Sequence, residues 1–71
     1  MKINYDKDAD AVYIKLSDLK PDGVVELKDS INVDITENEQ IVGIEILNVK
    51  KKLNPDTFLK YEFDNQLVEV L

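Results

Sequence analysis

The stretch INVDITENEQIVGIEIL, residues 31–47, decides the fold because it contains two strand patterns separated by a short polar turn. Ile31–Ile35 alternates isoleucine and valine with polar residues, which is the period-two pattern of a half-buried strand. Ile41–Leu47 is the most apolar run of the chain and alternates in the same way. The turn contains Asn38, the residue there best able to adopt a left-handed conformation. The stretch therefore predicts two adjacent antiparallel strands.

The strand pattern continues toward the N-terminus in shorter pieces. Residues 3–5, 12–16 and 24–27 carry apolar side chains at alternate or consecutive positions. Residues 20–23, with the sequence KPDG, are typical of a β-turn, because proline presets φ at the second position. Short strands joined by short turns predict an antiparallel β-meander of four to five strands.

The sequence changes character after the last strand. Asn54, Pro55 and Asp56 form a typical helix start, with asparagine as the N-cap and proline at the first helical position. We expect one short helix from there to about Lys60. Residues 67–71 are unusually apolar and suggest an added strand or a piece of interface. The chain is thus expected to be one α+β domain over residues 1–71. Residues 1–53 would form its β-rich core, and residues 54–71 the helix and a C-terminal extension.

Four blocks of the chain occur in an order typical of one family. They are INYD at residues 3–6, ADAVYIKL at 9–16, VDI at 33–35 and IVGIEIL at 41–47. Through these blocks, residues 1–53 resemble the small bacterial and archaeal family named domain of unknown function 2283, the YuzE-like proteins. The chain departs from the family in the turn before Ile41, where Asn-Glu-Gln stands in place of the frequent Asp-Gly.

The resemblance implies an antiparallel sheet with a helical piece after the last core strand, and it carries over no catalytic residue. Members of the family often resemble the smaller partner in paired genes whose neighbour is similar to a toxin-type nuclease. The resemblance therefore implies an antitoxin-like binding role.

The composition restricts the chemistry. The chain has no cysteine, no histidine and no arginine, so disulfides, thiolate metal sites and histidine-based catalysis are excluded. Fifteen acids oppose nine lysines and give a net charge of -6, which disfavours nucleic acid and favours a basic partner. No signal peptide and no apolar run of membrane-spanning length is visible, so a cytoplasmic protein without membrane contact is expected.

Three acids within the family blocks, Asp10, Asp34 and Glu45, form the candidate polar cluster. They could converge as a hard-metal site or an acid/base pair, or they could serve only turn and strand hydrogen bonds. If Glu45, between two isoleucines, is half-buried, it needs a hydrogen-bond donor. We assign no catalytic residue, cofactor ligand or metal ligand.

Three other features have structural interpretations. Residues 6–10, DKDAD, resemble a calcium loop but lack its glycine and glutamate, so we expect a turn in which aspartates accept backbone N–H bonds. Tyr5 and Tyr13 are expected to form a cross-strand pair. Gly43, inside a strand, suggests a bulge or the close approach of another backbone, such as a dimer mate's.

The energetics favour a partner. One short helix cannot cover the apolar face of a sheet of four to five strands, and neither disulfides nor thiolate metal sites can compensate. The sequence therefore predicts a homodimer, and the leading functional hypothesis is a non-enzymatic protein-binding module, antitoxin-like toward a basic protein from a neighbouring gene. One alternative is a structural homodimer with no other partner. The other is a carboxylate- and metal-dependent enzyme that uses the three acids.

Overall fold

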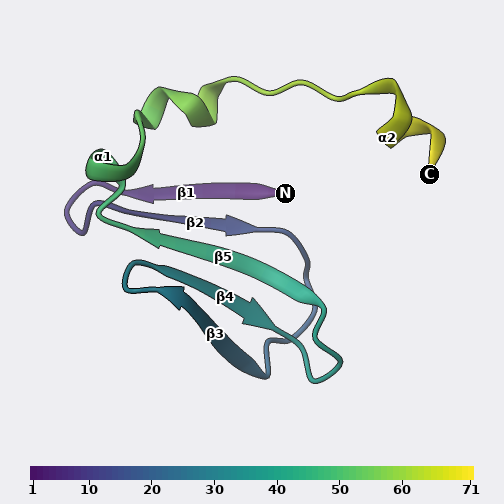
Figure 1. Ribbon diagram of the computed structural model, residues 1–71, viewed down its shortest axis with the longest axis horizontal. Coiled ribbons are helices and arrows are strands. Elements are labelled where there is room, and N and C mark those ends of the chain that lie inside the picture. Colours follow the sequence, from purple (N-terminus) through teal and green to yellow (C-terminus); the bar gives the residue numbers. More distant parts are fainter.

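The computed structural model describes residues 1–71 and shows a five-stranded antiparallel sheet followed by three short helices (Figure 1). The strands are β1 (Lys2–Asp6), β2 (Ala11–Lys15), β3 (Gly23–Lys28), β4 (Ile31–Ile35) and β5 (Ile41–Leu47). The helices are α1 (Val49–Lys52), the 3₁₀ helix η1 (Pro55–Leu59) and α2 (Asn65–Glu69). The predicted α+β class is confirmed. None of the helices has the length and apolar character that crossing a membrane requires.

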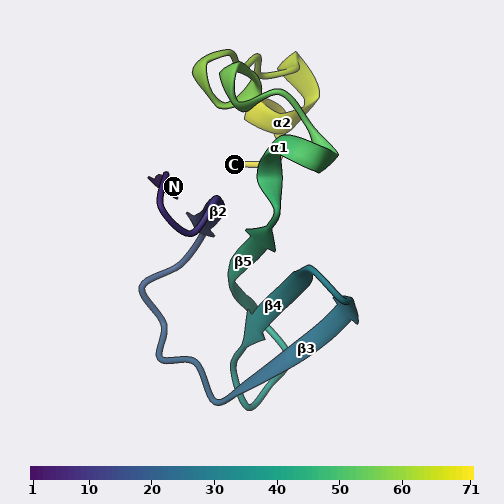
Figure 2. The ribbon, with the colours of Figure 1, turned by 90° about the vertical axis from the view of Figure 1, so that its left-hand side faces the viewer.

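The strand order in the sheet is β1-β2-β5-β4-β3, with β5, the most apolar strand, at the centre. β1 and β2 form one hairpin, and β3, β4 and β5 form a three-stranded meander whose last strand pairs with β2. The chain must therefore pass from β2 to the opposite edge of the sheet. Residues 16–22 make this connection and run past the ends of β5 and β4 (Figures 1 and 2).

The β-turn predicted at residues 20–23 is wrong for this topological reason. A β-turn joins adjacent strands, whereas β2 and β3 are three strand spacings apart, about 14 Å at ~4.8 Å per spacing. Pro21 and Asp22 lie instead in the open connection, and Gly23 begins β3. The left-handed residue of the β4–β5 turn is Glu39, with φ 65°, and not Asn38. The Thr36 carbonyl accepts the Glu39 N–H, so residues 36–39 form the turn and its last residue, Glu39, has the left-handed conformation.

Strand alternation separates the side chains into two faces of different character. Val12, for example, is opposite Ile46, and Val33 is opposite Ile44. The apolar face comprises Ile3 and Tyr5 on β1, Val12 and Ile14 on β2, Ile44 and Ile46 on β5, Ile31 and Val33 on β4, and Val25 on β3. The polar face, on the other side, carries Asn4, Tyr13, Gly43, Glu45, Asn32, Asp34, Val24 and Glu26.

The start of η1 follows the prediction closely. The Asn54 side chain accepts the Asp56 backbone N–H, and Pro55 occupies the first position of the helix. The helix is 3₁₀ in type, and α1 and α2 flank it as further short helices. Residues 67–71 do not form an added strand, because α2 and its C-cap Val70 occupy most of this stretch.

Candidate functional site

The centre of the polar face is a hydrogen bond that crosses the middle strand. The Tyr13 hydroxyl on β2 donates to Asp34 Oδ2 on β4 at 2.8 Å and reaches over β5 to do so. Gly43 of β5 lies between them, opposite Lys15 on one side and Asp34 on the other. A Cβ at Gly43 would overlap the hydroxyl end of Tyr13. The absence of a side chain at Gly43 therefore leaves the room that the Tyr13 side chain needs to cross β5.

This contact raises the pKa of Tyr13. The largest cause is the hydrogen bond to Asp34, followed by desolvation and by the negative charges of Asp34 and Glu45. The close approach predicted at Gly43 is present, but the approaching group is a side chain of the same molecule. The predicted Tyr5–Tyr13 pair is wrong, because Tyr5 is opposite Val12 and the two tyrosines lie on opposite faces.

Glu45 also lies on the polar face, in the central strand. It is half-buried, and its Oε1 accepts a hydrogen bond from Asn32 Nδ2 on β4 at 3.1 Å. The donor that a half-buried Glu45 requires is thus supplied by the residue directly opposite it. Glu45 and Asp34 occupy neighbouring positions on this face, yet each is bonded to a different neutral side chain.

Asp10 lies apart from these two acids, in the turn between β1 and β2, and adopts a left-handed conformation with φ 51°. Its carboxylate accepts the Lys50 backbone N–H at 3.2 and 3.4 Å, and its backbone carbonyl accepts the Val49 N–H at 3.1 Å. The Tyr5 hydroxyl donates to the same carboxylate at 3.0 Å. Asp10 therefore caps α1, whose own N-cap Asn48 makes no side-chain capping bond.

A small polar cluster completes this end of the molecule. Ser30, a buried residue of the β3–β4 turn, accepts a hydrogen bond from Asn48 Nδ2 through its hydroxyl, and its carbonyl accepts the Leu47 N–H. Val49 is fully buried beside it. In the turn between β1 and β2, the Asp6 carboxylate accepts hydrogen bonds from the backbone N–H groups of residues 8 and 9, as predicted for the DKDAD turn.

The structure does not bring the three candidate acids together. Asp34 and Glu45 share the polar face, whereas Asp10 is engaged with α1, and no group of three or more acidic side chains is arranged to hold a metal ion. Every buried side-chain nitrogen or oxygen has a hydrogen-bond partner. The acids thus serve the fold, by joining strands or capping a helix.

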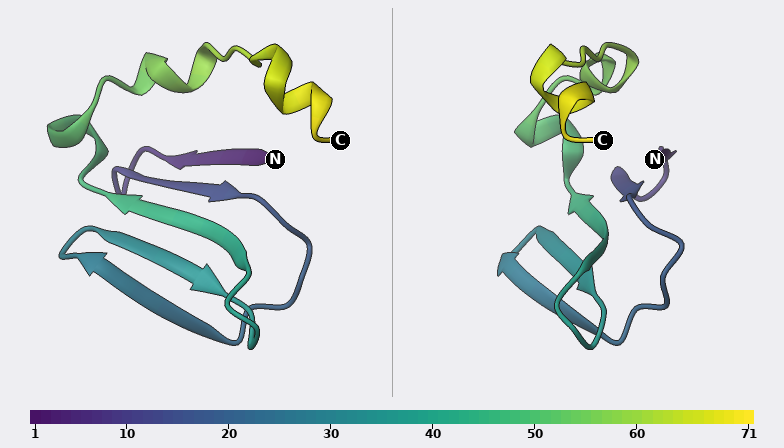
Figure 3. Two further views of the ribbon diagram at one scale, coloured as in Figure 1. Left: turned by 45° about the vertical axis from the view of Figure 1, so that its right-hand side comes forward. Right: turned by 90° about the vertical axis from the view of Figure 1, so that its right-hand side faces the viewer.

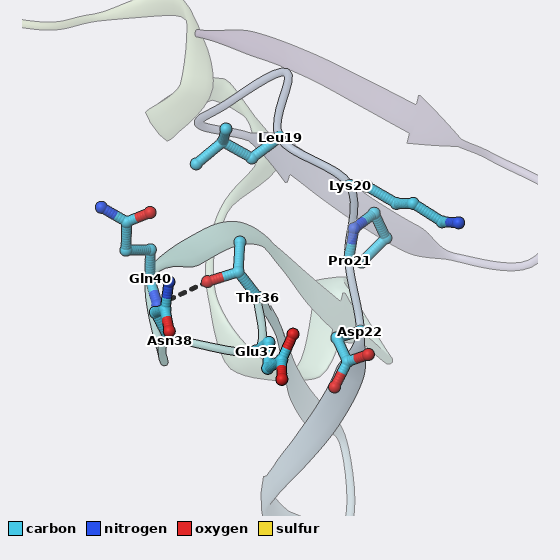
Figure 4. A pocket seen from close by; sticks show the side chains of 8 residues that line it. All are labelled: Leu19, Lys20, Pro21, Asp22, Thr36, Glu37, Asn38 and Gln40. Atoms are coloured by element: carbon cyan, nitrogen blue, oxygen red, sulfur yellow. Dashed lines mark hydrogen bonds between the residues drawn. The ribbon is translucent and has the colours of Figure 1, made fainter.

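The hollow with the most polar wall lies between the β2–β3 connection and the β4–β5 turn (Figure 4). It has a volume of about 360 Å³, and eight residues line it: Leu19, Lys20, Pro21, Asp22, Thr36, Glu37, Asn38 and Gln40. Two hydrogen bonds join Thr36 and Gln40 in this wall: the Gln40 N–H donates to the Thr36 hydroxyl, and the Thr36 N–H donates to the Gln40 carbonyl at 2.9 Å. Its wall is open, without a buried polar group directed into it, and the arrangement favours no ligand.

The feature most unusual for a folded domain is the amount of apolar surface left uncovered. Only five of the 71 residues are buried, and the apolar ones among them include Val12, Val42 and Val49. On the apolar face, exposure rises toward the sheet edges, to 40% at Tyr5 and 42% at Val25. The segment after β5 runs past β1 and leaves β4 and β3 without a covering element (Figures 2 and 3).

A second uncovered surface is formed by residues 61–71, which we call the arm. Its aromatic and aliphatic side chains are all strongly exposed, at values from 47% to 97%: Tyr61, Phe63, Leu67, Val68, Val70 and Leu71. The apolar tail was visible in the sequence. The open β4–β3 side was not, because it depends on where the later chain runs.

Comparison with known proteins identifies a family. Residues 2–50 match the family described as "Protein of unknown function (DUF2283)". The chain is also similar to "Uncharacterized protein MJ0789" of Methanocaldococcus jannaschii, with 36% identity over 69 residues. This similarity covers 97% of the chain and 56% of the relative, so the chain spans little more than half of that protein's length. No solved structure gives a significant match. The matched region contains all five strands and the start of α1, and the chain belongs to the DUF2283 family.

Proposed function

We propose that this protein is a non-enzymatic protein-binding module whose binding surface consists of the apolar face and the arm. The observation that carries the proposal is the total exposed area. The chain exposes 6007 Å². A folded monomer of 8.2 kDa exposes about 4,500 Å² by size scaling, so the excess is about 1,500 Å².

The shape of the chain supports the same proposal. Its radius of gyration is 13.5 Å, whereas a compact domain of this length has a value of about 11 Å. Part of this exposed area belongs to large apolar side chains, such as Phe63 at 66% and Val70 at 78% exposed, and clustered apolar surface is costly in water and marks sites of protein contact. The chemistry supports a non-enzymatic role, because Asp10, Asp34 and Glu45 are each bonded to groups of the fold.

The antitoxin-like form of the proposal adds a basic partner encoded by a neighbouring gene, in the cytoplasm. The net charge of -6 supports it, since an acidic protein attracts a basic one and accelerates their encounter. The arm contributes Glu62, Asp64 and Glu69 and no lysine. A basic protein would thus meet negative charge next to exposed apolar side chains.

The test is co-expression of the tagged protein with the product of the adjacent gene, followed by co-purification. Val25 and Val24 provide a matched pair, because they are neighbours on the edge strand β3 and point to opposite faces. Val25→Glu places a charge on the apolar face and should abolish co-purification, whereas Val24→Glu places it on the polar face and should not. Equal retention by both variants would contradict the proposed surface. Unimpaired growth of cells expressing the neighbour alone would contradict the antitoxin-like form.

A further inference from the structure

We infer that the partner on this surface is a second copy of the chain, and that the two copies exchange arms, each arm docking on the apolar face of the other copy. The inference rests on the proposed function, because it names the occupant of the proposed surface. It begins from the arm, which the sheet of its own chain does not hold in place.

Hydrogen bonding shows how loosely the arm is attached. The last bonds between the C-terminal segment and the rest of the domain are those of Val49 and Lys50 with Asp10. Every later hydrogen bond is local, such as that from the Gln66 N–H to the Asp64 carboxylate at the start of α2. A helix of five residues is unstable by itself in water. An arm that carries a capped helix and six exposed apolar side chains therefore needs a surface to bind.

A second copy offers such a surface. Its apolar face is open over β4 and β3, where Val25 is 42% exposed and Leu27, at the bulged end of β3, is 60% exposed. In the same molecule the arm lies along the other edge, beside β1 (Figure 1). Pro55 and Phe58 of η1 line a hollow with Ile3 and Tyr5 there, so the β1 side of the face is already partly occupied. The β3 side remains for an arm from outside.

The area required agrees with an exchanged dimer. Stable complexes bury about 800 Å² of accessible surface on each partner, and obligate homodimers commonly bury about 1,000–2,500 Å² on each partner. The excess of about 1,500 Å² per chain lies within the obligate range. Arm exchange would also cover the exposed arm and the exposed apolar face of each copy at the same time. Each copy gives one arm and receives one arm, which is the self-complementary arrangement of a twofold dimer.

The test measures the mass of the full chain by light scattering and the dissociation constant by sedimentation. The wild-type protein should have twice the chain mass, about 16 kDa. Val25→Glu damages the receiving face, and Leu67→Asp damages the arm. Each should raise the dissociation constant more than about tenfold. Val24→Glu and Gln66→Asp add the same charge on the polar face and on α2, and both should leave the dimer intact.

The decisive experiment mixes the two damaged proteins. The Val25→Glu chain has a sound arm, and the Leu67→Asp chain has a sound face, so arm exchange predicts that the equimolar mixture recovers dimers with one intact contact. A dimer of face against face would resist Leu67→Asp, a dimer of arm against arm would resist Val25→Glu, and neither would be rescued by mixing. Each of these outcomes overturns the exchange. A wild-type mass of about 8 kDa also overturns it, and leaves the co-purification test of the proposed function unaffected.

Discussion

Replacing Gly43 by alanine tests the arrangement at the centre of the polar face. The new Cβ would overlap the end of the Tyr13 side chain, and the carbonyl oxygen of Ile14 would lie 3.0 Å away. Tyr13 would have to move and would lose its hydrogen bond to Asp34. A half-buried bond to a carboxylate contributes about 1–2 kcal/mol, and forcing a side chain aside costs about 1–3 kcal/mol.

The net loss expected for Gly43→Ala is about 1–4.5 kcal/mol, after allowance for the ~0.5–1 kcal/mol by which alanine is favoured over glycine in a strand. A domain of this length has a total stability of about 4–10 kcal/mol, so the effect should be large. Urea unfolding followed by circular dichroism, at one fixed protein concentration, measures it. Gly23→Ala is the matched control, because nothing lies within 4 Å of a Cβ there.

A double-mutant cycle isolates the cause. In a Tyr13→Ala background the obstructing ring is absent and only the contact with the Ile14 carbonyl oxygen remains, so Gly43→Ala should cost much less free energy than in the wild type. If Gly43→Ala costs the same free energy in both backgrounds, the passage of Tyr13 over Gly43 is not the reason for the glycine, and the reasoning fails.

Three further predictions follow from the other contacts. Asp10→Ala should destabilise the protein by about 1–2 kcal/mol because α1 loses its cap. Asp10→Asn should destabilise it less, because asparagine keeps a hydrogen-bond acceptor and tolerates positive φ. Thermal unfolding of both variants checks these two expectations. Because the pKa of Tyr13 is raised in the folded protein, the stabilisation that Tyr13 provides should be fully present below pH 10.0, the ordinary tyrosine value, and should be lost as the pH rises through the raised value. Urea unfolding at pH 9 and 11 measures this loss of stability, and in the Tyr13→Phe variant the loss due to Tyr13 should be absent. Raising the salt from 0.05 to 0.5 M should tighten self-association, because each chain carries a charge of -6, and should weaken binding of a basic partner; sedimentation at both salt concentrations distinguishes these responses.

The sequence predicts the features that depend on neighbouring residues. The alternation in residues 31–47 gives both ends of β5 and the start of β4 correctly, and the Asn54-Pro55-Asp56 sequence locates the start of η1. Local turn chemistry also explains how Asp6 is used. In each case the cause lies within a few residues of the effect.

The features that the sequence did not reveal depend on strand order and register. Nothing local to Ala11–Lys15 indicates that β2 pairs with β5, thirty residues later, and without that pairing Tyr13 cannot be placed beside Gly43. The hydrogen-bond partners of the three candidate acids, Asn32, Tyr13 and Lys50, come from other strands or from α1, so they could not be assigned from the sequence. Gly43, within an apolar strand, was the one available signal; it indicated a bulge or the close approach of another backbone, whereas the approaching group is the Tyr13 side chain.

The two faces of the sheet are the reason that we propose a binding role. On the polar face, Asp34 and Glu45 each accept a hydrogen bond from a neutral side chain of another strand, and these bonds join the strands. The opposite face has the reverse property, because its apolar side chains need contacts that the short helices do not supply. The polar face is therefore satisfied within one chain and the apolar face is not. An additional molecule would be bound most favourably where the apolar surface and the arm remain uncovered.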